Sequence, residues 1–78
     1  MSTADAQPQA GAVAQIVVLP VTPGEPPFRL VEINGNVAGT VHDLPDLIEL
    51  AYKAGLKHVD LDDPAQVRWV GGGKYKWA

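Results

Sequence analysis

The carboxyl-terminal part of the chain interleaves aromatic and basic side chains. The rings are Trp69, Tyr75 and Trp77, and the cations are Arg68, Lys74 and Lys76. Aromatic faces that stack on bases, beside cations that bind phosphates, make up many nucleic-acid sites. Aromatic anchors are also frequent hot spots of protein interfaces. The expected partner-binding residues are therefore Arg68, Lys74, Lys76 and Trp77.

The spacing of these residues predicts a hairpin. Strands at 67–70 and 74–77 flank three glycines, and a three-residue loop pairs position 69 with 75 and 67 with 77. Because side chains alternate along a strand, the rings then share one face with Val67 and the cations share the other. We expect the rings to pack inward, since a small chain cannot leave two tryptophans exposed, and the cations to form a solvated strip.

Other chemically capable residues do not form a catalytic constellation. His58, Asp60 and Asp62 would line one face of a short strand at 58–61, but a metal site needs ligands that converge with a settled second shell. Asp43 and Asp63 are better explained as caps. We therefore expect no metal and no cofactor. No nucleophile accompanies a His–Asp pair, so we expect no catalytic residue and no enzyme.

Glycine and cysteine usage narrows the chemistry further. The three glycines at 71–73 precede a strand and lack the Lys-Ser/Thr signature, so they predict a turn and not a phosphate loop. The chain has no cysteine, which excludes disulfides and thiolate nucleophiles and fits a reducing compartment. The apolar stretch at 12–21 is far shorter than the ~20 residues that cross a bilayer, and no basic residue precedes it. We expect a cytoplasmic protein with no membrane contact.

Charge is divided along the chain, although its net value is only −3. Six acids lie within residues 43–63 against two lysines, whereas residues 64–78 hold three cations and no acid. Such a division can steer a charged partner, or it can serve only as solubilising charge with internal compensation.

The elements that position these residues begin after a small, polar stretch. Residues 1–12 cannot bury enough surface to offset their ordering entropy, which predicts a disordered arm, and 13–78 form the single domain. The β-branched stretch at 14–21 predicts a strand, with its proline at an edge or near the strand end, and the edge could pair with another chain.

Asn34-Gly35 between apolar runs predicts a hairpin over residues 28–41. Its register stays open at this stage. A two-residue loop pairs Ile33 with Asn36, whereas a three-residue loop pairs Ile33 with Val37 and gathers Val31, Ile33, Val37 and Val41 on one face.

A helix over 44–54 is predicted by its apolar spacing and its end signals. Asp43 can cap it, Asp46 stands in a capping-box-like position, and Gly55 supplies a left-handed stop. After it, Asp63 can cap a single helical turn that begins at Pro64.

Together these elements predict an α+β fold, a small mixed sheet built from two β-hairpins with one central helix (β-ββ-α-β-ββ). This order also suits a β-grasp-like arrangement, and residues 64–74 resemble the turn and strand that follow the helix of ubiquitin-like domains. No free diglycine tail follows, so no activity is carried over. The expected function is a non-enzymatic interaction or accessory module whose sheet edge and C-terminal hairpin meet another protein or a second copy. Nucleic-acid binding by the basic strip is the alternative.

Overall fold

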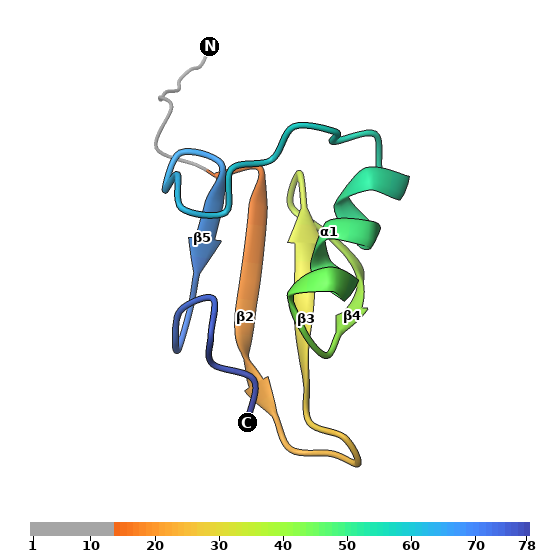
Figure 1. Ribbon diagram of the computed structural model, residues 1–78, viewed down its shortest axis with the longest axis vertical. Helices are drawn as coiled ribbons and strands as arrows, with labels where there is room; N and C mark the ends of the chain where they lie inside the picture. The colour runs from red at the N-terminus through yellow and green to blue at the C-terminus, as the bar shows by residue number, and fades with distance from the viewer. Residues whose placement is uncertain (1–13) are drawn as a thin grey trace, which may run out of the picture.

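The computed structural model describes residues 14–78, so the arm expected at 1–12 lies outside the described residues. One mixed sheet of four strands is accompanied by one helix (Figure 1). The strands are β2 (Ile16–Thr22), β3 (Phe28–Ile33), β4 (Asn36–Val41) and β5 (Val67–Trp69), and the helix is α1 (Leu44–Lys53). The predicted α+β class with a small mixed sheet is confirmed, and the β-grasp-like detail stays a prediction.

Strand β2 lies inside the sheet and not at its edge. The order is β4-β3-β2-β5, in which β2 pairs antiparallel with β3 and parallel with β5. The expectation that β2 offers an edge to another chain is therefore wrong. The strand tolerates Pro20 inside the sheet because this residue lies in a register irregularity between Val18 and Val21. It also lies beyond the last residue of β2 that pairs with β5.

The β3–β4 hairpin adopts the two-residue turn. Ile33 pairs with Asn36, and Asn34 and Gly35 have φ of 53° and 83°, the left-handed values that this turn needs. A bulge between Val31 and Glu32 then shifts the register, so Gly39 and Val41 face the core. Val37 stays 63% exposed, which excludes the face that the three-residue loop would have gathered.

Helix α1 begins and ends as its sequence predicts. The Asp43 Oδ1 accepts a hydrogen bond from the Asp46 N–H at 2.9 Å, and Gly55 has φ of 92°. The N–H groups of Gly55 and Leu56 donate to the carbonyls of Tyr52 and Ala51, which is a Schellman stop. The helix packs Leu47 and Ala51 onto one face of the sheet.

Two predicted strands do not form. Residues 58–61 are irregular because the Asp60 and Asp62 N–H groups bond to nearby side chains, which replaces a ladder. Residues 74–77 form a turn and an irregular end, so the prediction of a C-terminal hairpin is wrong. None of the helices within residues 14–78 is long and apolar enough to cross a membrane.

Candidate functional site

A buried arginine organises the carboxyl end of the chain. Alternation along β3 puts Arg29 on the core face with Val31 and Ile33, and its solvent exposure is 0%. Its guanidinium donates five hydrogen bonds, all to backbone carbonyls. Nε bonds to Leu19 at 2.8 Å, Nη1 to Gly73 at 2.9 Å and Lys76 at 2.8 Å, and Nη2 to Val70 at 3.0 Å and Gly72 at 2.8 Å.

This arrangement explains why no second hairpin strand forms. Arginine has five N–H donors, and here every one has an acceptor. Four of the acceptors belong to the segment after β5, and their carbonyls converge on one point. In a strand, successive carbonyls alternate sides and cannot converge in this way. The segment from 70 to 77, which we call the C-terminal segment, therefore wraps around a side chain of β3.

Two tryptophan rings complete the enclosure. The Cζ of Arg29 lies 5.4 Å from the ring centroid of Trp69 and 5.5 Å from that of Trp77, and the rings meet edge to face at 6.4 Å. Each ring face attracts the cation, which offsets part of the cost of burying it. Burial lowers the pKa of Arg29, but arginine stays charged at neutral pH. Sequence reasoning missed Arg29, although its alternation with Val31 and Ile33 is the signal that points to it.

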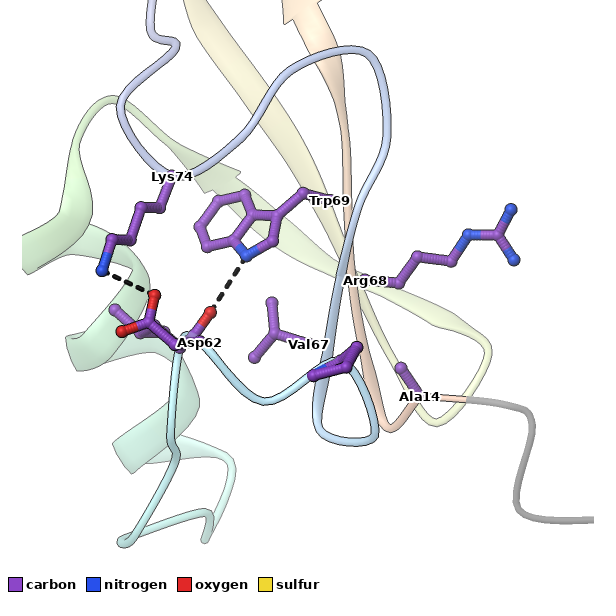
Figure 2. Close-up of a pocket in the computed structure, with 8 residues that line it drawn as sticks. Ala14, Asp62, Val67, Arg68, Trp69 and Lys74 are labelled. Atoms are coloured by element: carbon purple, nitrogen blue, oxygen red, sulfur yellow. Dashed lines mark hydrogen bonds and ion pairs between the residues drawn. The ribbon is translucent and has the colours of Figure 1, made fainter.

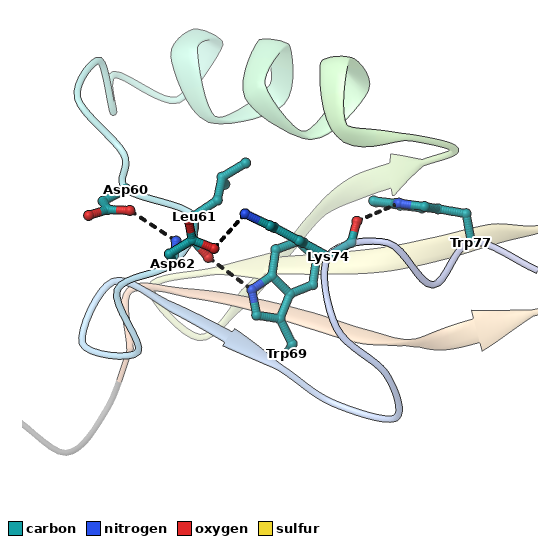
Figure 3. Close-up of polar contacts among 6 residues, drawn as sticks. All are labelled: Asp60, Leu61, Asp62, Trp69, Lys74 and Trp77. Carbon is teal, nitrogen blue, oxygen red and sulfur yellow. Dashed lines mark hydrogen bonds and ion pairs between the residues drawn. The ribbon is translucent and has the colours of Figure 1, made fainter.

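Both indole N–H groups are also bonded. Trp69 Nε1 donates to the Leu61 carbonyl at 3.1 Å, and Trp77 Nε1 donates to the Lys74 carbonyl at 2.7 Å (Figure 3). Both rings pack against the core and are partly buried. The inward placement of the tryptophans is confirmed, whereas that of Tyr75 is wrong. Tyr75 is 80% exposed because no strand imposes alternation there.

A hollow of about 510 Å³ lies beside β5 (Figure 2). We call it the β5 hollow. The strand contributes Val67, Arg68 and Trp69, and the loop before it contributes Leu61, Asp62 and Pro64; Lys74 and Ala14 complete the lining. Figure 2 shows Trp69 and Arg68 on opposite sides of the strand. Only Arg68 and Lys74 of the four expected partner-binding residues therefore border this hollow.

An ion pair forms part of the lining of the β5 hollow. Lys74 Nζ lies 2.6 Å from Asp62 Oδ1, and the lysine side chain is 26% exposed. This hydrogen bond is the main cause that raises the pKa of Lys74. The backbone of Asp62 is held in place for this pair, because its N–H donates a hydrogen bond to Asp60 Oδ1 at 3.0 Å. The pair joins the acidic stretch to the basic end of the chain, so part of the charge division is compensated internally.

The outer edge of β5 is open within residues 14–78. The Ile16 N–H donates to the Gln66 carbonyl at 3.0 Å, and the Val70 N–H donates to the Val18 carbonyl at 2.9 Å. In a parallel pair the backbone N–H and C=O groups of one residue point to the same side of the strand. Those of positions 66, 68 and 70 therefore point toward β2, while those of 67 and 69 point outward. The Val67 carbonyl and both backbone groups of Trp69 point outward, and no described residue bonds to them.

The remaining sequence-predicted residues lie elsewhere. Lys76 is exposed, and its side chain lies over Gly72, away from the β5 hollow. The Asp63 Oδ1 accepts from the Ala65 N–H at 2.8 Å, which confirms its cap. No group of three acids or histidines that could hold a metal ion occurs within the described part of the chain.

Comparison with known proteins adds no relative. The chain matches none of the protein-family models, none of the curated proteins and none of the solved structures. What the geometry defines is a class, a small α+β domain with an open sheet edge beside a polar-rimmed hollow.

Proposed function

We propose that this domain is a non-catalytic protein-interaction module that binds an extended segment of another protein along the outer edge of β5. The observation that carries the proposal is the outer edge of β5, with which no residue in the described range 14–78 pairs. A strand that exposes a carbonyl, an N–H and a second carbonyl can add a strand from another chain by main-chain hydrogen bonds. The β5 hollow beside this edge offers room for alternate side chains of such a segment.

The surroundings of the edge supply selectivity. Trp69 gives the β5 hollow an apolar wall, and the Lys74–Asp62 pair gives it a polar rim. The C-terminal segment adds Lys76 and the exposed Tyr75 nearby in the chain. The sheet edge is the binding surface, and the irregular C-terminal segment stands where a hairpin was expected. We also propose a cytoplasmic location, which rests on the lack of cysteine.

The edge can be tested first without a partner, by amide hydrogen exchange. We expect the Arg68 N–H, which faces β2, to exchange slowly and the Trp69 N–H to exchange fast. A linear peptide library then supplies ligands, and bound peptides should slow exchange at Trp69. Slow exchange at Trp69 in the free chain, or bound peptides that leave it unchanged, would refute edge binding.

Substitutions test the lysines of the site. Lys74→Gln with Lys76→Gln should weaken peptide binding, because Lys74 lines the β5 hollow and Lys76 is the other cation of the same C-terminal segment. Lys53→Gln with Lys57→Gln removes the same charge at the end of α1 and beyond it, and should leave binding unchanged. Equal losses in the two double variants would show that net charge alone acts.

Nucleic-acid binding remains a second candidate because of one observation. The Tyr75 ring is 80% exposed, and Lys74 Nζ lies 5.2 Å from its centroid. An exposed ring beside cations can stack on a base, although the two tryptophans are held by the core. Titration with a single-stranded oligonucleotide should then show affinity that falls with salt. No binding at low salt excludes this candidate.

A further inference from the structure

The face of the sheet opposite α1 is open within residues 14–78. Alternation assigns Ile16, Val18 and Val31 to the helix side, where they are buried, and their neighbours Val17 and Leu30 to the other side. In Figure 3 the helix lies on one side of the sheet, and no second helix of the described residues covers the opposite side. Val17 and Leu30 are half-buried there by their neighbours alone.

The charges on this open face are few and ordered. The four strands hold only three charged residues, of which Arg29 points into the core. The other two, Arg68 and Glu32, both stand level with Val17, because Val17 pairs with Glu32 on one side and with Arg68 on the other. Neither takes part in an ion pair with another described residue.

The row of Arg68, Val17 and Glu32 across three neighbouring strands has self-complementary charges. Arg68 and Glu32 each lie one strand from Val17, in opposite directions, about 4.8 Å away. Consider a second copy placed face to face with the first, related by a twofold axis that runs parallel to β2 between the two sheets. The rotation brings Arg68 of each copy over Glu32 of the other and Val17 over Val17. An axis across the strands would instead oppose like charges.

We propose that two copies of this chain associate through their open sheet faces, with Arg68 of each copy paired to Glu32 of the other. Aligned packing of two sheets about 10 Å apart is a common arrangement, and a twofold interface uses the same patch twice. The edge of β5 is a separate surface, so this inference does not rest on the proposed function.

The size of the face sets the expected strength. Four strands span only about 14 Å across, and interfaces under about 1,200 Å² in total belong to weak associations. The dimer is therefore expected to form at high protein concentration. Sedimentation equilibrium over a wide concentration range should show a reversible monomer–dimer equilibrium. A chain that stays monomeric over the whole range would overturn the proposal.

Charge exchange tests the geometry. Arg68→Glu or Glu32→Arg alone places like charges together at two contacts per dimer, which should weaken association about tenfold or more. The double variant Arg68→Glu with Glu32→Arg restores both pairs and should dimerise as the unmodified chain does. A double variant as weak as the single ones would overturn the pairing.

Two further variants separate this face from others. Val17→Lys sets two cations against each other near the axis and should abolish the dimer, with circular dichroism to verify that the chain is folded. Lys76→Glu makes the same change of charge as Arg68→Glu but lies in the C-terminal segment, and should leave association unchanged. A dimer that survives Val17→Lys, or is lost in Lys76→Glu, would place the interface elsewhere.

Discussion

Replacement of Arg29 by lysine should lower the free energy of unfolding by a large share, although it keeps the charge. Lysine has at most three donors where arginine has five, so at least two of the five carbonyls lose their hydrogen bond. Each buried polar group left unpaired costs about 1–3 kcal/mol, which gives a loss of about 2–6 kcal/mol. For 78 residues the expected free energy of unfolding is about 4–12 kcal/mol, so the loss is a large share.

Replacement by methionine separates charge from geometry. Arg29→Met leaves five carbonyls unpaired but also removes the cost of burying a cation, and we expect a net loss similar to that of the lysine variant. Lysine retains that cost and lacks the planar fork. The two variants should therefore be destabilised to a similar degree, because donor geometry and not charge holds the C-terminal segment.

Urea unfolding followed by tryptophan fluorescence measures both variants. The assay reports directly on this cluster, since both tryptophans contact Arg29. Arg68→Lys is the matched control; that side chain is exposed, and its variant should stay within about 0.5 kcal/mol. An Arg29→Lys free energy within about 0.5 kcal/mol of the unmodified chain would refute the reasoning.

Three further predictions concern the neighbouring features. Gly72→Ala should destabilise the fold by about 1–3 kcal/mol in a urea titration, because φ is 132° and a Cβ would meet the Lys76 side chain at 2.5 Å; Gly73→Ala, where a Cβ meets nothing within 4 Å, is the control and should change little. The pKa of Lys74 is raised in the folded state, so its contribution is complete below its unfolded value of about 10.4 and is lost above it. The stability difference between the unmodified chain and Lys74→Met should thus be constant from about pH 7 to 10 and shrink at higher pH, and a difference that grows there would contradict the assignment. Asp43→Ala removes the cap of α1 and should cost about 1 kcal/mol in thermal unfolding, whereas an unchanged midpoint would mean that the Asp46 N–H finds another acceptor.

Local signals in the sequence predicted the parts of the fold that depend on near neighbours. The helix from Leu44 follows from its cap, its apolar spacing and Gly55, all within one short stretch. The turn at Asn34-Gly35 follows from two residues that tolerate positive φ. These choices involve contacts a few positions apart, which periodicity and turn chemistry describe directly.

The C-terminal segment could not be predicted in the same way. Its two tryptophans and three glycines fit a hairpin when read alone, because alternation sorts rings from cations. What overrides that pattern is Arg29, because four of its five acceptors lie 41 to 47 positions further along the chain. The arginine was visible on the apolar face of its strand, but the sequence does not state which carbonyls it meets. The parallel partnership of β5 with β2 is non-local for the same reason.

The distance in sequence between Arg29 and its acceptors has a consequence for the order of folding. The β3–β4 hairpin closes a two-residue turn, whereas the guanidinium can meet four of its five carbonyls only after a loop of more than 40 residues has closed. Long loops close late, because closing them costs conformational entropy before the contacts between their ends form and offset that cost. Substitutions at Arg29 should therefore accelerate unfolding more than they slow refolding, and the arm of the chevron plot at high denaturant should carry most of their effect.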